Sequence, residues 1–118
     1  MSYTLAITDF RLPDDFDEAH EQVNPLLHQS VDEVAPVFVE FHKRVTAVYP
    51  CICDLPDDLL DDGVWSDGPL INNFKVKVPV IGFVYRKVAE AAPTVIQMAL
   101  DAGLSVMDWQ SGRIYNPD

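Results

Sequence analysis

Three histidines, two cysteines and 19 Asp and Glu residues are the side chains of this 118-residue chain that could do chemistry. Acids follow Cys51 and Cys53 and no lysine or arginine lies nearby, which disfavours a reactive thiolate. His20, His28 and His42 fall on two expected helices, where a solvated or hydrogen-bonded histidine is the expectation. No GxGxxG, GxxxxGK[ST], HExxH or GxSxG motif occurs. We therefore expect no catalytic residues and no enzyme.

The aspartates do not have the spacing of a metal site. A helix-loop-helix calcium site needs alternating D-x-D-x-D-G and a closing Glu, which are missing around Asp54, Asp57, Asp58 and Asp62. Besides Cys51 and Cys53, no second Cys or His pair stands at zinc-ligand spacing. We expect neither a metal nor a cofactor.

Several features predict a cytoplasmic chain. A disulfide between Cys51 and Cys53 would close a small, strained ring, so we expect two thiols in a reducing compartment. Residues 1–10 lack the basic start and apolar run of a signal peptide. The longest apolar stretch, 78–85, is far shorter than the ~20 residues that cross a bilayer, so no membrane partner is expected.

The charge is large and unevenly distributed. The formal net charge is -11, and residues 1–74 hold 15 acids against 3 bases. This charge repels nucleic-acid phosphates, which disfavours a nucleic-acid partner. Like charges in a cluster also repel one another, and a counter-charge relieves this repulsion. The composition therefore favours a basic partner.

Two clusters make this acidity. The first lies on an expected helix and consists of Asp14, Asp15, Asp17, Glu18 and Glu21. The second surrounds Trp65 in a connection, where an aromatic residue inside a charged rim is typical of a protein-binding hot spot. Its predicted partner-binding residues are Asp54, Asp57, Asp58, Asp61, Asp62, Trp65 and Asp67. Two alternatives stay open: each cluster is only a solvated face, and Trp65 plugs the edge of the core.

Hydrophobic periodicity predicts the elements that position these residues. The expected order is strand 3–8, helix 14–27, a second helix, irregular connection 51–69, strand 75–84 with 71–74 paired to it, helix 88–100, and a terminal hairpin over 104–109 and 113–115. This order predicts an α+β two-layer sandwich, a mainly antiparallel sheet with two to three helices packed on it, forming one domain over 1–118.

The second helix has the clearest pattern. Valine and phenylalanine residues recur at helical spacing and form one apolar stripe: Val34, Val37, Phe38, Phe41, Val45 and Val48. Ser30 and Glu33 have the spacing of a capping box, and a later start with Pro36 in the first turn is equally consistent. Pro50 ends the helix.

Four segments together resemble a family of small acidic bacterial proteins: SYTLAITDF, FHKRVTAVYP, WSDGPL and ALDAGLSVMDWQSGRIYNP. Family members begin with S-Y-x-L-x-V-x-D and end in A-x-x-x-G-L-x-V-x-D-x-Q-x-G-x-[VI]-x-x-P. The second pattern is matched by Ala99, Gly103, Leu104, Val106, Asp108, Gln110, Gly112, Ile114 and Pro117. Trp109 departs from the proline expected there.

The family includes immunity proteins of polymorphic, type VI and Rhs toxin systems. The resemblance implies a non-catalytic protein that binds and blocks a cognate toxin domain, whose basic surface an acidic loop would meet. No catalytic residues are implied. A second interpretation is a small cytosolic binding module, self-associating or regulatory, that forms a homodimer through its sheet edge and has no toxin partner.

Overall fold

The computed structural model describes residues 2–50, 63–65 and 74–117. Its elements are β1 (Ser2–Thr8), α1 (Phe16–Val23), the 3-10 turn η1 (Asn24–His28), α2 (Pro36–Val48), β2 (Val80–Val84), the 3-10 turn η5 (Tyr85–Lys87), α3 (Val88–Asp101), β3 (Ser105–Asp108) and β4 (Arg113–Tyr115). Most of the expected connection 51–69 and residues 71–73 of the expected pairing segment 71–74 lie outside the described residues.

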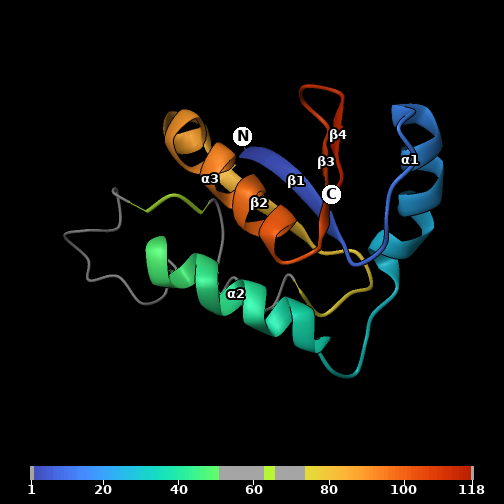
Figure 1. Cartoon of the computed structure of the whole chain (residues 1–118), viewed down its shortest axis with the longest axis horizontal. Helices are drawn as coiled ribbons and strands as arrows, with labels where there is room; N and C mark the ends of the chain where they lie inside the picture. Colours follow the sequence, from blue (N-terminus) through green and yellow to red (C-terminus); the bar gives the residue numbers. More distant parts are fainter. Residues whose placement is uncertain (1, 51–62, 66–73, 118) are drawn as a thin grey trace.

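The four strands form one antiparallel sheet in the order β2-β1-β3-β4. β1 occupies an inner position and pairs with β2 on one side, Leu5 opposite Ile81, and with β3 on the other, Ile7 opposite Val106. The first strand of the chain is therefore held between two strands that come from its second half, as Figure 1 shows.

Alternation along β1 directs its side chains to the two faces of the sheet. Leu5 and Ile7 enter the larger core, which α2 and α3 cover, while Ala6 faces a smaller core with Met107 and the α1 residue Val23. The α+β sandwich is confirmed: an antiparallel sheet carries α2 and α3 as its helical layer. α1 covers part of the opposite face.

Cap residues and prolines explain the two ends of α1 and the start of α2. Asp15 caps α1, since its side chain accepts from the Glu18 backbone N–H at 3.1 Å. α1 ends at Val23, and Pro25 lies in η1, so the expected helix 14–27 is shorter and ends in a 3-10 turn. α2 begins at Pro36 with Ala35 as its cap residue, which is the later of the two starts that the sequence allowed.

The second half of the chain agrees with the expected helix and hairpin and corrects one strand. Gly103 ends α3 with φ 81° and Gly112 turns the hairpin with φ 68°, both in the left-handed region that favours glycine. Strand 75–84 was predicted too long: β2 begins at Val80, and Val76 makes only an isolated bridge to Ser30. Pro79 has no N–H to donate, so it precedes the strand.

The side chain of Asn116 joins both ends of the chain. Its Oδ1 accepts from the Leu12 N–H at 2.9 Å and from the Ser105 hydroxyl at 2.7 Å, and its Nδ2 donates to the Leu12 carbonyl at 3.0 Å. Arg11 adds a hydrogen bond to the Pro117 carbonyl. The connection that leads into α1 is thus fixed to the segment after β4.

Asn116→Ala should lower the free energy of unfolding by about 1–3 kcal/mol, because it leaves the partly buried Leu12 amide and Ser105 hydroxyl without their acceptor. Urea denaturation monitored by circular dichroism measures the loss. The same change at the exposed Asn24 is the control and should alter stability by less than about 0.5 kcal/mol. Equal effects of the two substitutions would show that the Asn116 contacts do not stabilise the fold.

Candidate partner-binding surface

Most residues of the predicted loop site lie outside the described part of the chain. Its six aspartates, Asp54, Asp57, Asp58, Asp61, Asp62 and Asp67, lie outside the described residues. Only Trp65 of the predicted set is placed, so the loop assignment stays a prediction.

Trp65 is a core residue. It is 1% exposed, stacks on Phe83 with ring centroids 5.0 Å apart, and donates from Nε1 to the Tyr49 carbonyl at 2.7 Å. A backbone bridge to Phe83 fixes its segment against β2. An anchor for a partner must be exposed. The prediction of Trp65 as a partner-binding residue is therefore corrected, and the alternative that it plugs the core edge holds.

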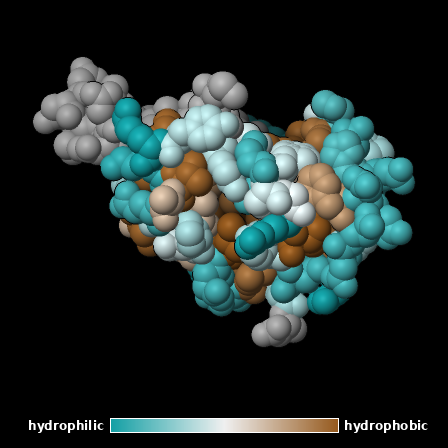
Figure 2. All heavy atoms as spheres, turned by 90° about the horizontal axis from the view of Figure 1, so that it is seen from above, coloured by the Kyte–Doolittle hydropathy of each residue, from teal (hydrophilic) through white to brown (hydrophobic). Residues whose placement is uncertain are grey.

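The acidic cluster on the first helix is placed in full. Ala19 and Val23 of α1 are buried and Phe16 partly so, a spacing that turns one side of the helix to the smaller core. All five acids are exposed: Asp14, Asp15, Asp17, Glu18 and Glu21. Figure 2 shows hydrophilic side chains gathered at the end of the molecule where α1 lies. We call these five residues the α1 acidic surface.

Part of this acidity is explained by the helix itself. Asp15 is the N-cap, and Asp17 and Glu18 lie in the first turn, where carboxylates favour the positive end of the helix dipole. Asp14 and Glu21 have neither function. The helix start therefore accounts for three of the five charges.

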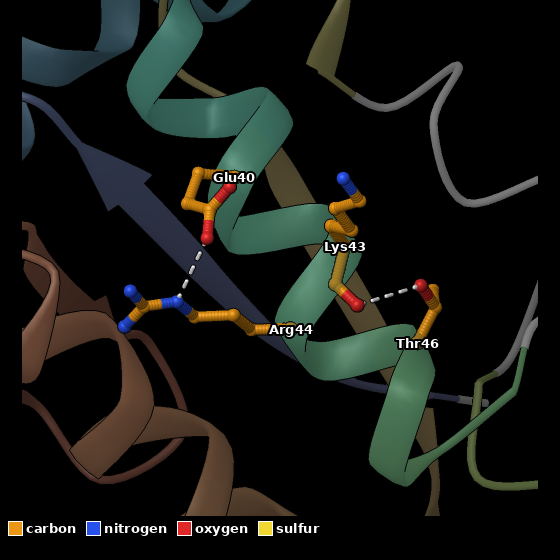
Figure 3. A network of polar contacts seen from close by, with 4 residues as sticks. All are labelled: Glu40, Lys43, Arg44 and Thr46. Atoms are coloured by element: carbon orange, nitrogen blue, oxygen red, sulfur yellow. Dashed lines mark hydrogen bonds and ion pairs between the residues drawn. The ribbon is translucent and has the colours of Figure 1, made fainter.

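The α2 helix provides a contrast. Its Glu40 is paired with Arg44 across one helical turn, with Arg44 Nε 3.2 Å from Glu40 Oε1, while the Lys43 carbonyl accepts from the Thr46 hydroxyl (Figure 3). Among the described residues, the other ion pair joins Lys87 and Glu90 at the start of α3. Within the same residues, no ion pair reaches the α1 acidic surface. Its charge is available to a partner.

The three histidines lie on α1, the η1 turn and α2. His20 is exposed and lies over Phe16, His28 is exposed, and His42 contacts the ring of Phe74 edge-on at 5.9 Å. In the described ranges, no three His, Cys, Asp or Glu side chains form a group that could hold a metal ion. Within those ranges too, no helix has the length and apolar character needed to cross a membrane.

A buried carboxylate at the terminal hairpin was missed by sequence reasoning. Asp108 is 3% exposed; its Oδ1 accepts from the backbone N–H groups of Gln110 and Ser111, and its Oδ2 accepts from the Tyr3 hydroxyl at 2.5 Å. Burial first, and then the hydrogen bond and negative charge of Asp108, raise the pKa of Tyr3 to about 12. The D-x-Q-x-G pattern was the available signal. The contacts show an Asp that closes a turn and holds β1.

The geometry defines a small α+β protein with one acidic helical surface. No protein-family model, curated protein or solved structure matches the chain. The case for its function rests on the chain itself.

Trp65→Ala should lower the free energy of unfolding by about 3–5 kcal/mol, because it empties a large core volume and removes the hydrogen bond to Tyr49. Trp65→Phe keeps an aromatic ring against Phe83 and should cost less. Chemical denaturation of both variants measures this order. Wild-type stability in Trp65→Ala would contradict the core assignment.

The pKa of Tyr3 should fall below about 12 in Asp108→Asn, because the anionic acceptor is removed while burial of the phenol persists. In the wild type, a Tyr3 pKa raised from 10.0 gives stability that is complete below pH 10 and is lost as pH rises toward 12. The tyrosine absorbance change on alkaline titration, with Tyr3→Phe subtracted, reports this residue. An identical Tyr3 pKa in both proteins would exclude an influence of Asp108.

Proposed function

We propose that this protein is a non-catalytic immunity protein that binds the basic surface of a cognate toxin domain in the bacterial cytoplasm and blocks it. The observation that carries the proposal is the α1 acidic surface, whose five exposed carboxylates meet no cation of the described residues through an ion pair. The sequence resemblance to immunity proteins of toxin systems supports the same role.

The physical reason is electrostatic. Exposed like charges raise the free energy of the compact state, and a basic partner removes this repulsion on binding. Complementary surfaces also steer the two proteins together, which raises the association rate more than it slows dissociation. An immunity protein has to reach its toxin before the toxin acts, so rapid association suits the function. The acidic loop residues Asp57, Asp58, Asp61 and Asp62 belong to the same proposal.

The partner is sought first. The tagged protein is immobilised, incubated with lysate of its own bacterium, and washed at low and then high salt, and bound proteins are identified by mass. The proposal expects one partner with a basic domain that high salt releases and that is toxic when produced alone. Recovery of only the protein itself would instead support the self-associating module.

Neutralising three of the five residues of the α1 acidic surface, in Asp14→Asn/Asp17→Asn/Glu21→Gln, should slow association with that partner about tenfold at low salt and flatten its salt dependence, because steering scales with charge. Stopped-flow or surface-plasmon kinetics measure the rate. Glu40→Gln/Glu90→Gln/Asp101→Asn is the matched control, since it removes three exposed acids from α2 and α3. Equal slowing in both triple variants would show an effect of net charge alone. Asp57→Asn/Asp58→Asn/Asp61→Asn/Asp62→Asn tests the loop separately.

A further inference from the structure

A cavity of about 410 Å³ opens beside α2, away from the hairpin and from Trp65. Segments far apart in sequence line it: the residues after β1, η1 with the η1–α2 connection, the first turn of α2, and residues 74–77. Of the ten described residues that line it, seven are apolar: Phe10, Leu26, Val31, Ala35, Phe38, Phe74 and Val76. This volume and lining lie within the range of binding pockets.

Backbone hydrogen bonds hold two walls of this cavity together. The Val31 N–H donates to the Lys75 carbonyl at 3.0 Å, and the Lys77 N–H donates to the Gln29 carbonyl at 2.9 Å. Phe38 and Phe74 of the lining are buried and pack on each other, with ring centroids 5.8 Å apart. The cavity is therefore formed before any ligand binds, which reduces the entropic cost of binding.

The charged residues of the cavity are exposed. Among the described lining residues, Asp9, Glu33 and Lys77 carry the charges and sum to a net negative charge. Within the described part of the chain, no ion pair includes any of the three. From Asp9 the chain continues within a few residues to Asp14 and the α1 acidic surface. The apolar cavity thus has acids at its opening that are free to meet a cation.

We infer that this cavity seats one bulky apolar side chain of a basic polypeptide, with Lys or Arg neighbours of that side chain contacting Asp9 and Glu33. An apolar anchor in a preformed pocket with charged groups around it is the usual arrangement of a protein-binding hot spot. A second copy of this chain fits poorly, since it would bring a net charge of -11 to an acidic opening. The inference rests on the proposed function, to which it adds the chemistry of the partner's contact.

Short peptides test the cavity without the cognate partner. The full chain, labelled at its Ala, Leu and Val methyl groups, is titrated with acetyl-Lys-Trp-Lys-amide, acetyl-Glu-Trp-Glu-amide and acetyl-Lys-Gly-Lys-amide and followed by NMR. The Lys-Trp-Lys peptide should shift the methyl signals of Leu26, Val31 and Ala35 and bind at least about fivefold more tightly than either other peptide. Equal binding of the Glu-Trp-Glu peptide, or shifts confined to other methyl groups, would overturn the inference.

Variants separate the cavity from the α1 acidic surface. Asp9→Asn/Glu33→Gln should weaken the Lys-Trp-Lys peptide about fivefold, whereas the matched Asp17→Asn/Glu21→Gln on α1 should change it less than about twofold. Val31→Trp should fill the cavity and abolish the shifts. If this substitution prevents folding, the two charge variants still test the inference. Signal changes on dilution of the protein alone, in place of peptide-induced shifts, would overturn the inference in favour of a second copy.

The two proposals fail in different ways. If no toxin partner is captured but the Lys-Trp-Lys peptide binds as expected, the immunity function fails and the cavity remains a binding site for basic apolar segments. In the second case a toxin partner is captured, and its affinity depends on the α1 acidic surface but not on Asp9 and Glu33. The immunity function then stands, and the cavity is overturned as a contact with the toxin.

Discussion

The position of β1 inside the sheet is the constraint on which the rest of the structure depends. This strand hydrogen-bonds to β2 on one side and β3 on the other, and its side chains enter a core on each face. Leu5 and Ile7 meet α2 and α3, while Ala6 leaves space for Met107 and α1. Because β2 and β3 come from the second half of the chain, the sheet forms only when both ends of the sequence meet.

Polar contacts at the two ends of the sheet complete this arrangement. Asp108 joins β1 to the hairpin turn through Tyr3, and Asn116 joins the residues after β4 to Leu12. Each replaces water around a partly buried polar group with several hydrogen bonds, which makes the geometry specific as well as stable. The bonds between Asn116 and Leu12 also fix the connection that leads into α1, and therefore the place of its acids.

Charge and core are separated in the described fold. The apolar residues of α1 turn inward, and its acids face solvent at one end of the molecule. On α2, Glu40 forms an ion pair with Arg44, and this positive charge weakens the negative potential around Glu40. Neutralising Asp14 and Glu21, whose charges are exposed, would leave the core intact.

The sequence by itself determined the elements whose signals are local: the alternation of β1, the stripe of α2, and the glycines that end α3 and turn the hairpin. It also determined the charge of α1, since helical spacing alone turns Ala19 and Val23 away from the acids. Tertiary structure decided the rest. Trp65 among acids has the pattern of an exposed anchor, and only its stacking on Phe83 shows it as core, because burial depends on residues distant in sequence. The cavity beside α2 was invisible for the same reason: its walls come from four separate segments.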